Sequence, residues 1–275
     1  MVFDGCLLLS DIDGTLYHNG KIAEGNIEKI DYFRRNGGVF AIATGRNITG
    51  AVLVADECSK NAGGYLLCSG GGTLIDLGTG AKLFEESLGP EDKLLFEKVS
   101  AAFPDIGAEV QSGEKIYIVK MSESIRWHME YESLNFAEKS VDEIRETKWT
   151  KCLFYDADTA KMKDIIDYVS TLSPIDGYFI TTTVGDGKVI LEFLPSKSKK
   201  SVGGQRLKRI VGARTLYAIG DYYNDIDMLL SADVSACVGG SPDEVVKSAD
   251  YTVCRCENGA VAEFIDLIER LESSK

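Results

Sequence analysis

Short apolar segments that end in polar residues and a glycine constrain this sequence most. Residues 7–9 are all leucine, and the chain continues through Ser10 to Asp11, Asp13 and Gly14. A continuous apolar run of this length is typical of a parallel strand buried on both faces. Gly14 permits the sharp exit that such a strand end requires. Because open α/β sheets bind ligands at the carboxyl ends of their strands, Asp11 and Asp13 are predicted to lie at a functional site.

Two carboxylates one residue apart repel each other, so the pair needs a cation between them or two different roles. A carboxylate binds Mg²⁺, and it can also attack phosphorus to form an aspartyl-phosphate. A solvated Asp-Gly turn after a strand is the simpler alternative. The sequence Asp-Ile-Asp-Gly-Thr-Leu from Asp11 to Leu16 resembles the first motif of the haloacid dehalogenase superfamily of phosphotransferases.

The second apolar strand is predicted over residues 39–43, after a helix over 25–36, and it ends at Thr44, Gly45 and Arg46. A hydroxyl and backbone N–H groups just before a helix start form a cradle for phosphate, although threonine is also a common helix N-cap. Thr44 matches the second superfamily motif, and Thr-Gly-Arg is its usual form in the Cof-like branch.

A third strand is predicted over residues 65–68, after a helix over 47–60. The chain has Gly70-Gly71-Gly72 where Cof-like proteins commonly have Asn-Gly-Ala, so it keeps a flexible turn and lacks the asparagine side chain.

The helix–strand rhythm changes between residues 83 and 192. Asp186-Gly187 lies between two strand-like segments and indicates a hairpin, so the region has an α+β pattern with antiparallel pairing. Trp127, His128 and Trp149 are interpreted as core or surface residues of this insert, with stacking on a sugar as the alternative. The strand-like and helix-like segments are residues 90–103, 115–120, 123–138, 151–156, 158–171, 178–184 and 188–194.

A lysine-rich segment follows the insert. The Cof-like pattern is Glu-Ile-x-Pro, a short turn and then Lys-Gly at a helix start. Counting from Pro195 favours Lys200, which Ser201 follows in place of glycine; Lys197 and Lys199 are the alternatives, and a solvated loop is the simpler interpretation. One ammonium group would neutralise the nucleophile and the transferring phosphoryl oxygens.

The last motif follows an apolar strand over residues 215–219. The sequence from Gly220 reads Gly-Asp-Tyr-Tyr-Asn-Asp-Ile-Asp-Met-Leu, which resembles the acidic motif of the superfamily. The resemblance implies that Asp221 binds the metal and that Asn224 and Asp225 bind it directly or support its ligands. Asp227 is predicted to lie on a helix surface.

Together the motifs predict an α/β fold: a Rossmann-like parallel-sheet core over 1–82 and 193–275, with an inserted α+β cap domain over 83–192. The resemblance implies a Mg²⁺-dependent phosphatase acting on a small phosphorylated metabolite, a sugar or polyol phosphate. A phosphosugar mutase and a non-catalytic binding protein on the same core are the alternatives. The resemblance implies that Asp11 is the nucleophile and that Asp13 is the general acid–base. Thr44 and Lys200, beside Gly45 and Arg46, would bind the phosphoryl oxygens. The implied metal ligands are Asp11, Asp13 (by its backbone carbonyl), Asp221, Asn224 and Asp225.

The composition of the chain argues against some classes of binding partner and favours one cellular compartment. The net charge of −13 argues against nucleic acid or an anionic membrane as a partner. Seven cysteines, an odd number lying mostly in apolar runs, favour free thiols in a reducing compartment. Without a signal-peptide pattern or an apolar run of ~20 residues, the chain is predicted to be cytoplasmic. The physiological substrate and the oligomeric state stay open.

Overall fold

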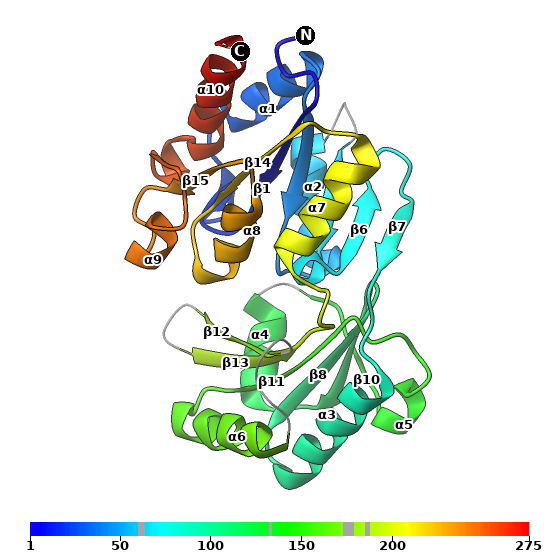
Figure 1. Ribbon diagram of the computed structural model, residues 1–275. Helices are drawn as coiled ribbons and strands as arrows, with labels where there is room; N and C mark the ends of the chain where they lie inside the picture. Colours follow the sequence, from blue (N-terminus) through cyan, green and yellow to red (C-terminus); the bar gives the residue numbers. More distant parts are fainter. Residues whose placement is uncertain (60–63, 132–133, 173–178, 185–187, 275) are drawn as a thin grey trace. The chain divides into compact units, whose positions relative to one another are not determined.

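The computed structural model describes residues 1–59, 64–131, 134–172, 179–184 and 188–274 (Figure 1). The chain divides into two compact units. The first, the core unit, comprises residues 1–46, 51–84 and 197–275, and the second, the insert unit, comprises residues 47–50 and 85–196. The first junction lies further along the chain than the predicted 82/83, because β7 (Lys82–Glu85) still belongs to the sheet of the core unit. The second lies further along than the predicted 192/193, because β13 (Lys188–Phe193) belongs to the sheet of the insert unit.

A largely parallel sheet forms the centre of the core unit. Among the described residues its strand order is β16-β15-β14-β1-β4-β5-β6-β7, with β6 antiparallel to β5. A short hairpin, β2 and β3, follows β1. The remaining strand bounds are β1 (Cys6–Ser10), β2 (Tyr17–His18), β3 (Lys21–Ile22), β4 (Val39–Ala43), β5 (Tyr65–Cys68), β6 (Thr73–Asp76), β14 (Thr215–Gly220), β15 (Val234–Val238) and β16 (Tyr251–Val253).

Helices cover both faces of this sheet, as expected for strands that are apolar throughout. On one face Leu7 and Leu9 pack with Leu207 of α7 and Met228 of α8, which Figure 1 shows in front of the strands. On the other face the ring of Tyr217 meets Phe264 of α10. The helices are α1 (Asn26–Arg35), α2 (Ile48–Ser59), α7 (Lys200–Val211), α8 (Ile226–Ser231), α9 (Asp243–Val246) and α10 (Ala260–Ser273), with 3₁₀ turns η1 (Ser69–Gly71), η2 (Tyr223–Asp225) and η3 (Cys256–Asn258).

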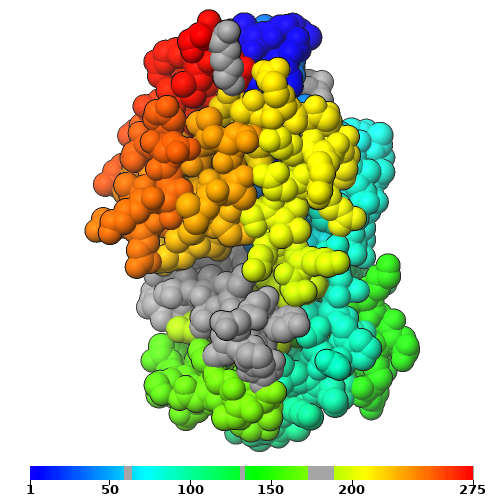
Figure 2. All heavy atoms as spheres, viewed as in Figure 1, coloured from blue at the N-terminus to red at the C-terminus, as the bar shows by residue number. Residues whose placement is uncertain are grey.

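The C-terminal helix α10 packs against the rest of the core unit. α10 buries a stripe of apolar residues at helical spacing, including Phe264, Ile265 and Ile268. Its polar side bonds to α1, where the Tyr32 hydroxyl donates to Glu269 at 2.5 Å. In the space-filling view the segments from α7 to α10, yellow to red, form a continuous surface on this side of the core unit (Figure 2).

The insert unit is an α+β structure, as predicted. Its sheet has the order β10-β9-β8-β11-β13-β12, in which β9 and β10 are parallel and the other pairings are antiparallel. Trp149 is fully buried beside Phe96 in its apolar core. The elements are α3 (Pro90–Ala102), β8 (Gly107–Ser112), β9 (Lys115–Lys120), α4 (Glu123–Tyr131), β10 (Ala137–Glu138), α5 (Val141–Ile144), β11 (Lys151–Asp156), α6 (Thr159–Leu172), β12 (Phe179–Val184) and β13 (Lys188–Phe193).

One sequence prediction for the insert is wrong in part, and another concerns residues that the structure does not describe. Of the helix predicted over 123–138, α4 comprises Glu123–Tyr131, whereas residues 137–138 pair with β9 as β10. The predicted hairpin turn at Asp186-Gly187 lies outside the described residues. In the part of the chain that the structure describes, no helix is long and apolar enough to cross a membrane.

Candidate active site

Three neighbouring strands of the core sheet end at the same edge. Asp11 follows β1, Thr44 follows β4 and Asp221 follows β14, and both outer strands pair with β1 in parallel. The backbone N–H of Asp11 donates to the carbonyl of Ile219 at 3.0 Å, which extends the pairing past the end of β1. Parallel strand order therefore brings together motifs that are far apart in the sequence.

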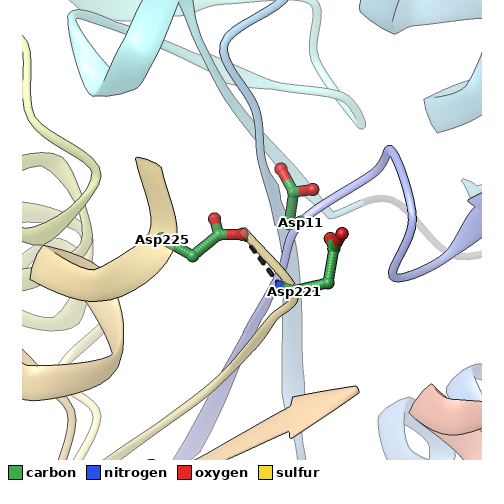
Figure 3. Close-up of side chains that lie close together, drawn as sticks. All are labelled: Asp11, Asp221 and Asp225. Atoms are coloured by element: carbon green, nitrogen blue, oxygen red, sulfur yellow. Dashed lines mark hydrogen bonds between the residues drawn. The ribbon is translucent and has the colours of Figure 1, made fainter. Parts of the chain in front are cut away.

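Three carboxylates meet at this edge. Oxygen atoms of Asp11, Asp221 and Asp225 lie within 4.8 Å of one another. Figure 3 shows the side chains of Asp11 and Asp221 rising from neighbouring strand ends, while Asp225 reaches in from the adjacent helical turn. Asp11 is 5% exposed and Asp225 is fully buried, so these charges are largely removed from water.

A buried ammonium group joins two of the carboxylates. Lys200 Nζ donates to Asp11 Oδ1 at 2.5 Å and to Asp225 Oδ1 at 2.6 Å. Lys200 is the first residue of α7 and is 3% exposed, whereas Lys197 and Lys199 are exposed. The lysine favoured by counting from Pro195 is therefore the one that reaches the acidic cluster.

Asp225 orients its neighbours through both of its oxygens. Oδ1 accepts from Lys200, and Oδ2 accepts from the backbone N–H groups of Asp221 at 3.0 Å and Tyr222 at 3.2 Å. The dashed line in Figure 3 marks the bond to Asp221. These bonds favour a supporting role for Asp225, which fixes Lys200 and the loop that carries Asp221.

The Gly-Thr of the first motif holds Asp221 from the other side. Thr15 Oγ1 donates to Asp221 Oδ1 at 2.7 Å. Gly14 has φ +83°, and a Cβ atom there would lie 2.2 Å from Asp221 Oδ2. The position thus needs glycine both for its backbone conformation and for the close approach of the carboxylate. No role was predicted for Thr15 from the sequence, although its place in the first motif was a signal for one.

The glycine turn after β5 supports the start of α7. Gly71 has φ +97°, and a Cβ atom there would lie 2.3 Å from the carbonyl oxygen of Lys199. Asp227 Oδ2 accepts from the backbone N–H of Ser201 at 3.1 Å and from its hydroxyl at 2.5 Å. The prediction that Asp227 is only helix surface is therefore wrong, because it ties α8 to the first turn of α7, where Lys200 lies.

The other predicted site residues surround this cluster. Thr44 is buried, and its Oγ1 accepts from the backbone N–H of Arg46 at 3.1 Å, across Gly45. Asp13 is exposed and forms an ion pair with Arg46. Asn224 is exposed in η2, next to Asp225.

Burial and mutual repulsion set the protonation of the acidic cluster. Burial and the nearby carboxylates raise the pKa of Asp11 well above its ordinary value, although Lys200 acts in the opposite direction. Burial also raises the pKa of Asp221 to about 6, against the hydrogen bond from Thr15, which lowers it. Burial disfavours the ammonium of Lys200, but Asp11 and Asp225 outweigh it and raise the pKa of Lys200.

The donor set fits a hard divalent cation. The clustered side-chain ligands are all carboxylate oxygens, which Mg²⁺ prefers over nitrogen or sulfur donors. Besides burial, repulsion between the carboxylates raises the pKa of Asp11 and of Asp221, and Lys200 offsets this effect only in part. A bound cation between these two carboxylates would offset the rest.

A family model described as haloacid dehalogenase-like hydrolase matches residues 8–265. The chain therefore belongs to the haloacid dehalogenase-like hydrolases, a family of enzymes, and its resemblance to the Cof-like branch is confirmed. No curated protein sequence matches the chain.

Solved structures share the fold across nearly the whole chain. A haloacid dehalogenase-like hydrolase from Bacteroides thetaiotaomicron has a TM-score of 0.82 at 23% identity, covering 97% of this chain and 99% of that one. TM0651 from Thermotoga maritima has a TM-score of 0.81 at 16% identity, covering 95% and 96%. The subclass IIB sugar phosphatase BT4131 has a TM-score of 0.77 at 16% identity, covering 95% and 98%. These similarities confirm the predicted α/β fold.

Proposed function

We propose that this enzyme is a Mg²⁺-dependent phosphatase that hydrolyses a small phosphorylated metabolite through an aspartyl-phosphate on Asp11. The observation that carries the proposal is the buried contact of Lys200 Nζ with Asp11, 2.5 Å apart, beside the carboxylate of Asp221. A carboxylate held next to a fixed ammonium and a cation-binding group is equipped to attack a phosphate dianion that it would otherwise repel.

The residues divide the chemistry between them. The Asp11 carboxylate forms a bond to phosphorus as the bond to the alcohol oxygen breaks, and Asp13 donates a proton to that oxygen. Water then gives a proton to Asp13 and attacks phosphorus as the bond to the Asp11 oxygen breaks. Inorganic phosphate is released, and both residues return to their starting states. Lys200 and Thr44 hold the transferring oxygens, with Gly45 and Arg46 beside them.

Asp11, Asp221 and the backbone carbonyl of Asp13 would hold Mg²⁺, with Asn224 and Asp225 supporting them. When bound, the ion would polarise the phosphoryl group and neutralise part of its charge.

The proposed substrate class is a sugar or polyol phosphate. Its support is the similarity in fold to a sugar phosphatase, together with the insert unit, which contains none of the predicted catalytic or metal-binding residues. We propose that this insert is a cap that selects the leaving alcohol. The seven free cysteines support a reducing compartment, and hence the cytoplasm, as the site of action.

The test is phosphate release from a panel of phosphorylated sugars, polyols and other small metabolites, with Mg²⁺ and with EDTA. We expect Mg²⁺-dependent release, fastest for members of the sugar or polyol group. Transfer of phosphate between positions of a sugar, dependent on a bisphosphate and with little release to water, would instead identify a phosphosugar mutase. Saturable binding without turnover of any compound would indicate a binding protein.

A further inference from the structure

The general acid–base proposed above, Asp13, differs from the neighbouring acids in its surroundings. Its side chain is 55% exposed, whereas Asp11 and Asp225 are buried. An exposed aspartate side chain can adopt several rotamers, but proton transfer requires its oxygen to lie within hydrogen-bond reach of the reacting atom. Some group must therefore fix the Asp13 carboxylate if it transfers protons efficiently.

Arg46 engages both oxygens of that carboxylate. Arg46 Nε donates to Asp13 Oδ2 at 2.8 Å, and Nη2 donates to Oδ1 at 2.5 Å. Two parallel N–H···O bonds from a planar guanidinium fix the position of the carboxylate and the rotation of its plane. A single ammonium group would fix only a distance, so arginine is suited to this task and lysine is not.

The guanidinium is itself held in place from two directions. The backbone N–H of Arg46 donates to Thr44 Oγ1 at 3.1 Å, which anchors the residue at the end of β4. The guanidinium carbon also lies 5.7 Å from the ring centroid of Tyr17. The carbonyl of Tyr17 accepts from the N–H of Gly14 at 3.0 Å, so the ring belongs to the same turn as Asp13. Asp13, Arg46 and Tyr17 thus form one connected group within the core unit.

We propose that Arg46 is a positioning residue that orients Asp13 for proton transfer, and that Tyr17 holds the guanidinium in place. The inference rests on the proposed function, because it takes Asp13 to be the general acid–base. The two-bond arrangement fits the ionised carboxylate that accepts a proton from water. When Asp13 carries the proton, its unprotonated oxygen still accepts one bond from Arg46, so the group remains oriented while it serves the leaving alcohol.

A double-mutant cycle tests this coupling. We would measure kcat and KM for p-nitrophenyl phosphate with saturating Mg²⁺ in wild type, Arg46→Ala, Asp13→Asn and the double variant. We expect Arg46→Ala to lower kcat by about 10- to 100-fold, because a misplacement of ~1 Å costs up to about 10² in rate. In the Asp13→Asn background the same substitution should change kcat by less than about twofold, since the group that it orients is already disabled. KM should change little in either background.

Conservative variants separate positioning from charge. Arg46→Lys keeps the positive charge but loses the two-bond geometry, so it should recover only a small part of kcat. Tyr17→Phe keeps the ring and should resemble wild type, whereas Tyr17→Leu should lower kcat about two- to fivefold through loss of the cation–π contact. The loss from Tyr17→Leu should also vanish in the Asp13→Asn background.

The control is Arg206→Ala, which removes another arginine that stacks on an aromatic ring, 3.9 Å from the centroid of Phe84. It should leave kcat unchanged in both backgrounds, and thermal unfolding checks that each variant is folded.

An equal loss from Arg46→Ala in both backgrounds, or a loss confined to KM, would overturn the inference and identify Arg46 as a direct phosphate-binding group. A wild-type enzyme that hydrolyses phosphate esters but is unaffected by Asp13→Asn would overturn both the inference and the proposed role of Asp13. Absence of any turnover by wild type would overturn the proposed function itself.

Discussion

Asp11 and Asp13 are separated by one residue, yet their surroundings suit them to different tasks. Asp11 is buried against Lys200, which favours a fixed nucleophile whose charge is partly balanced. Asp13 is largely exposed and is held by Arg46, which favours a group that exchanges protons with a leaving alcohol and with water. The contrast between a buried and an exposed carboxylate is a common way to separate a nucleophile from an acid–base.

Replacement of Asp13 should reveal its role through the leaving group. We expect Asp13→Asn to lower turnover by about 10²–10⁴, the usual range for loss of a general acid–base. The loss should be smaller for p-nitrophenyl phosphate than for an alkyl phosphate, because nitrophenolate departs without a proton. The ratio of kcat/KM values for the two substrates, compared between variant and wild type, measures this difference. Equal losses for both would contradict a role in protonating the leaving group.

At the residue level, the residues of the acidic cluster were easier to predict from the sequence than the side chains that hold them in place. Asp11, Asp221 and Lys200 could be identified because each follows a strand or a proline at a recognisable spacing. The bond from Thr15 to Asp221 and the ion pair between Asp13 and Arg46 could not be predicted. Both depend on the positions of residues brought together by the fold, and neither leaves a pattern in the order of the residues.

Strands and helices of the core unit follow from their apolar runs. β1, β4 and β5 are buried on both faces over most of their length, so their residues are mainly apolar and easily recognised. β8 in the insert was not predicted because Glu109 and Gln111 interrupt its apolar pattern, although both are buried. Ala108 and Val110 do alternate with these polar residues, but two apolar residues are too few to indicate a strand from the sequence.

The turn formed by η1 should matter for catalysis because it contacts the start of α7. A Cβ atom at Gly71 would lie 2.3 Å from the backbone oxygen of Lys199, so Gly71→Ala should displace Lys200. Gly80→Ala is a matched control, since Gly80 also has positive φ (+70°) but nothing lies within 4 Å of a Cβ atom there. Both variants should lose about 1–2 kcal/mol of folding stability from backbone strain, and Gly71→Ala should lose more because its Cβ atom would clash with Lys199.

Only Gly71→Ala should lose activity, by about 10-fold or more through misplacement of the ammonium group. Chemical unfolding and kcat for p-nitrophenyl phosphate measure the two effects. Equal activity in the two variants would show that the turn does not position Lys200.

For the molecule as a whole, the net charge of −13 poses a problem for the binding of an anionic substrate. The core unit supplies local positive charge through Lys200 and Arg46 at the edge of the sheet, and its cluster of carboxylates is suited to bind a cation. Without a cation, the acidic cluster is a source of electrostatic strain in the folded protein.

That strain should appear in the pH dependence of stability. Burial raises the pKa of Asp221 from 3.8 to about 6, so the folded metal-free protein binds this proton more tightly than the unfolded chain does. Its stabilising contribution is present below about pH 4 and is lost as the pH rises through about 6. Asp221→Asn, which stays uncharged, should therefore gain stability relative to wild type by up to about 3 kcal/mol between pH 4 and pH 7 in EDTA.

Thermal unfolding of both proteins across this pH range measures the difference. Saturating Mg²⁺ should stabilise wild type at pH 7 more than it stabilises Asp221→Asn, because it binds the ionised carboxylate. A difference between the two proteins that is independent of pH would show that Asp221 does not titrate in this range.

The proposed mechanism makes Asp11 the nucleophile of a Mg²⁺-dependent phosphatase. Its most direct test is the rate of phosphate release from p-nitrophenyl phosphate by wild type and by Asp11→Asn, each with Mg²⁺ and with EDTA. Asparagine has nearly the same shape but cannot attack phosphorus, so we expect a folded variant with less than about one hundredth of the wild-type rate. Wild type should lose its activity in EDTA. Substantial turnover by Asp11→Asn, or wild-type activity that persists without a divalent cation, would contradict the proposed mechanism.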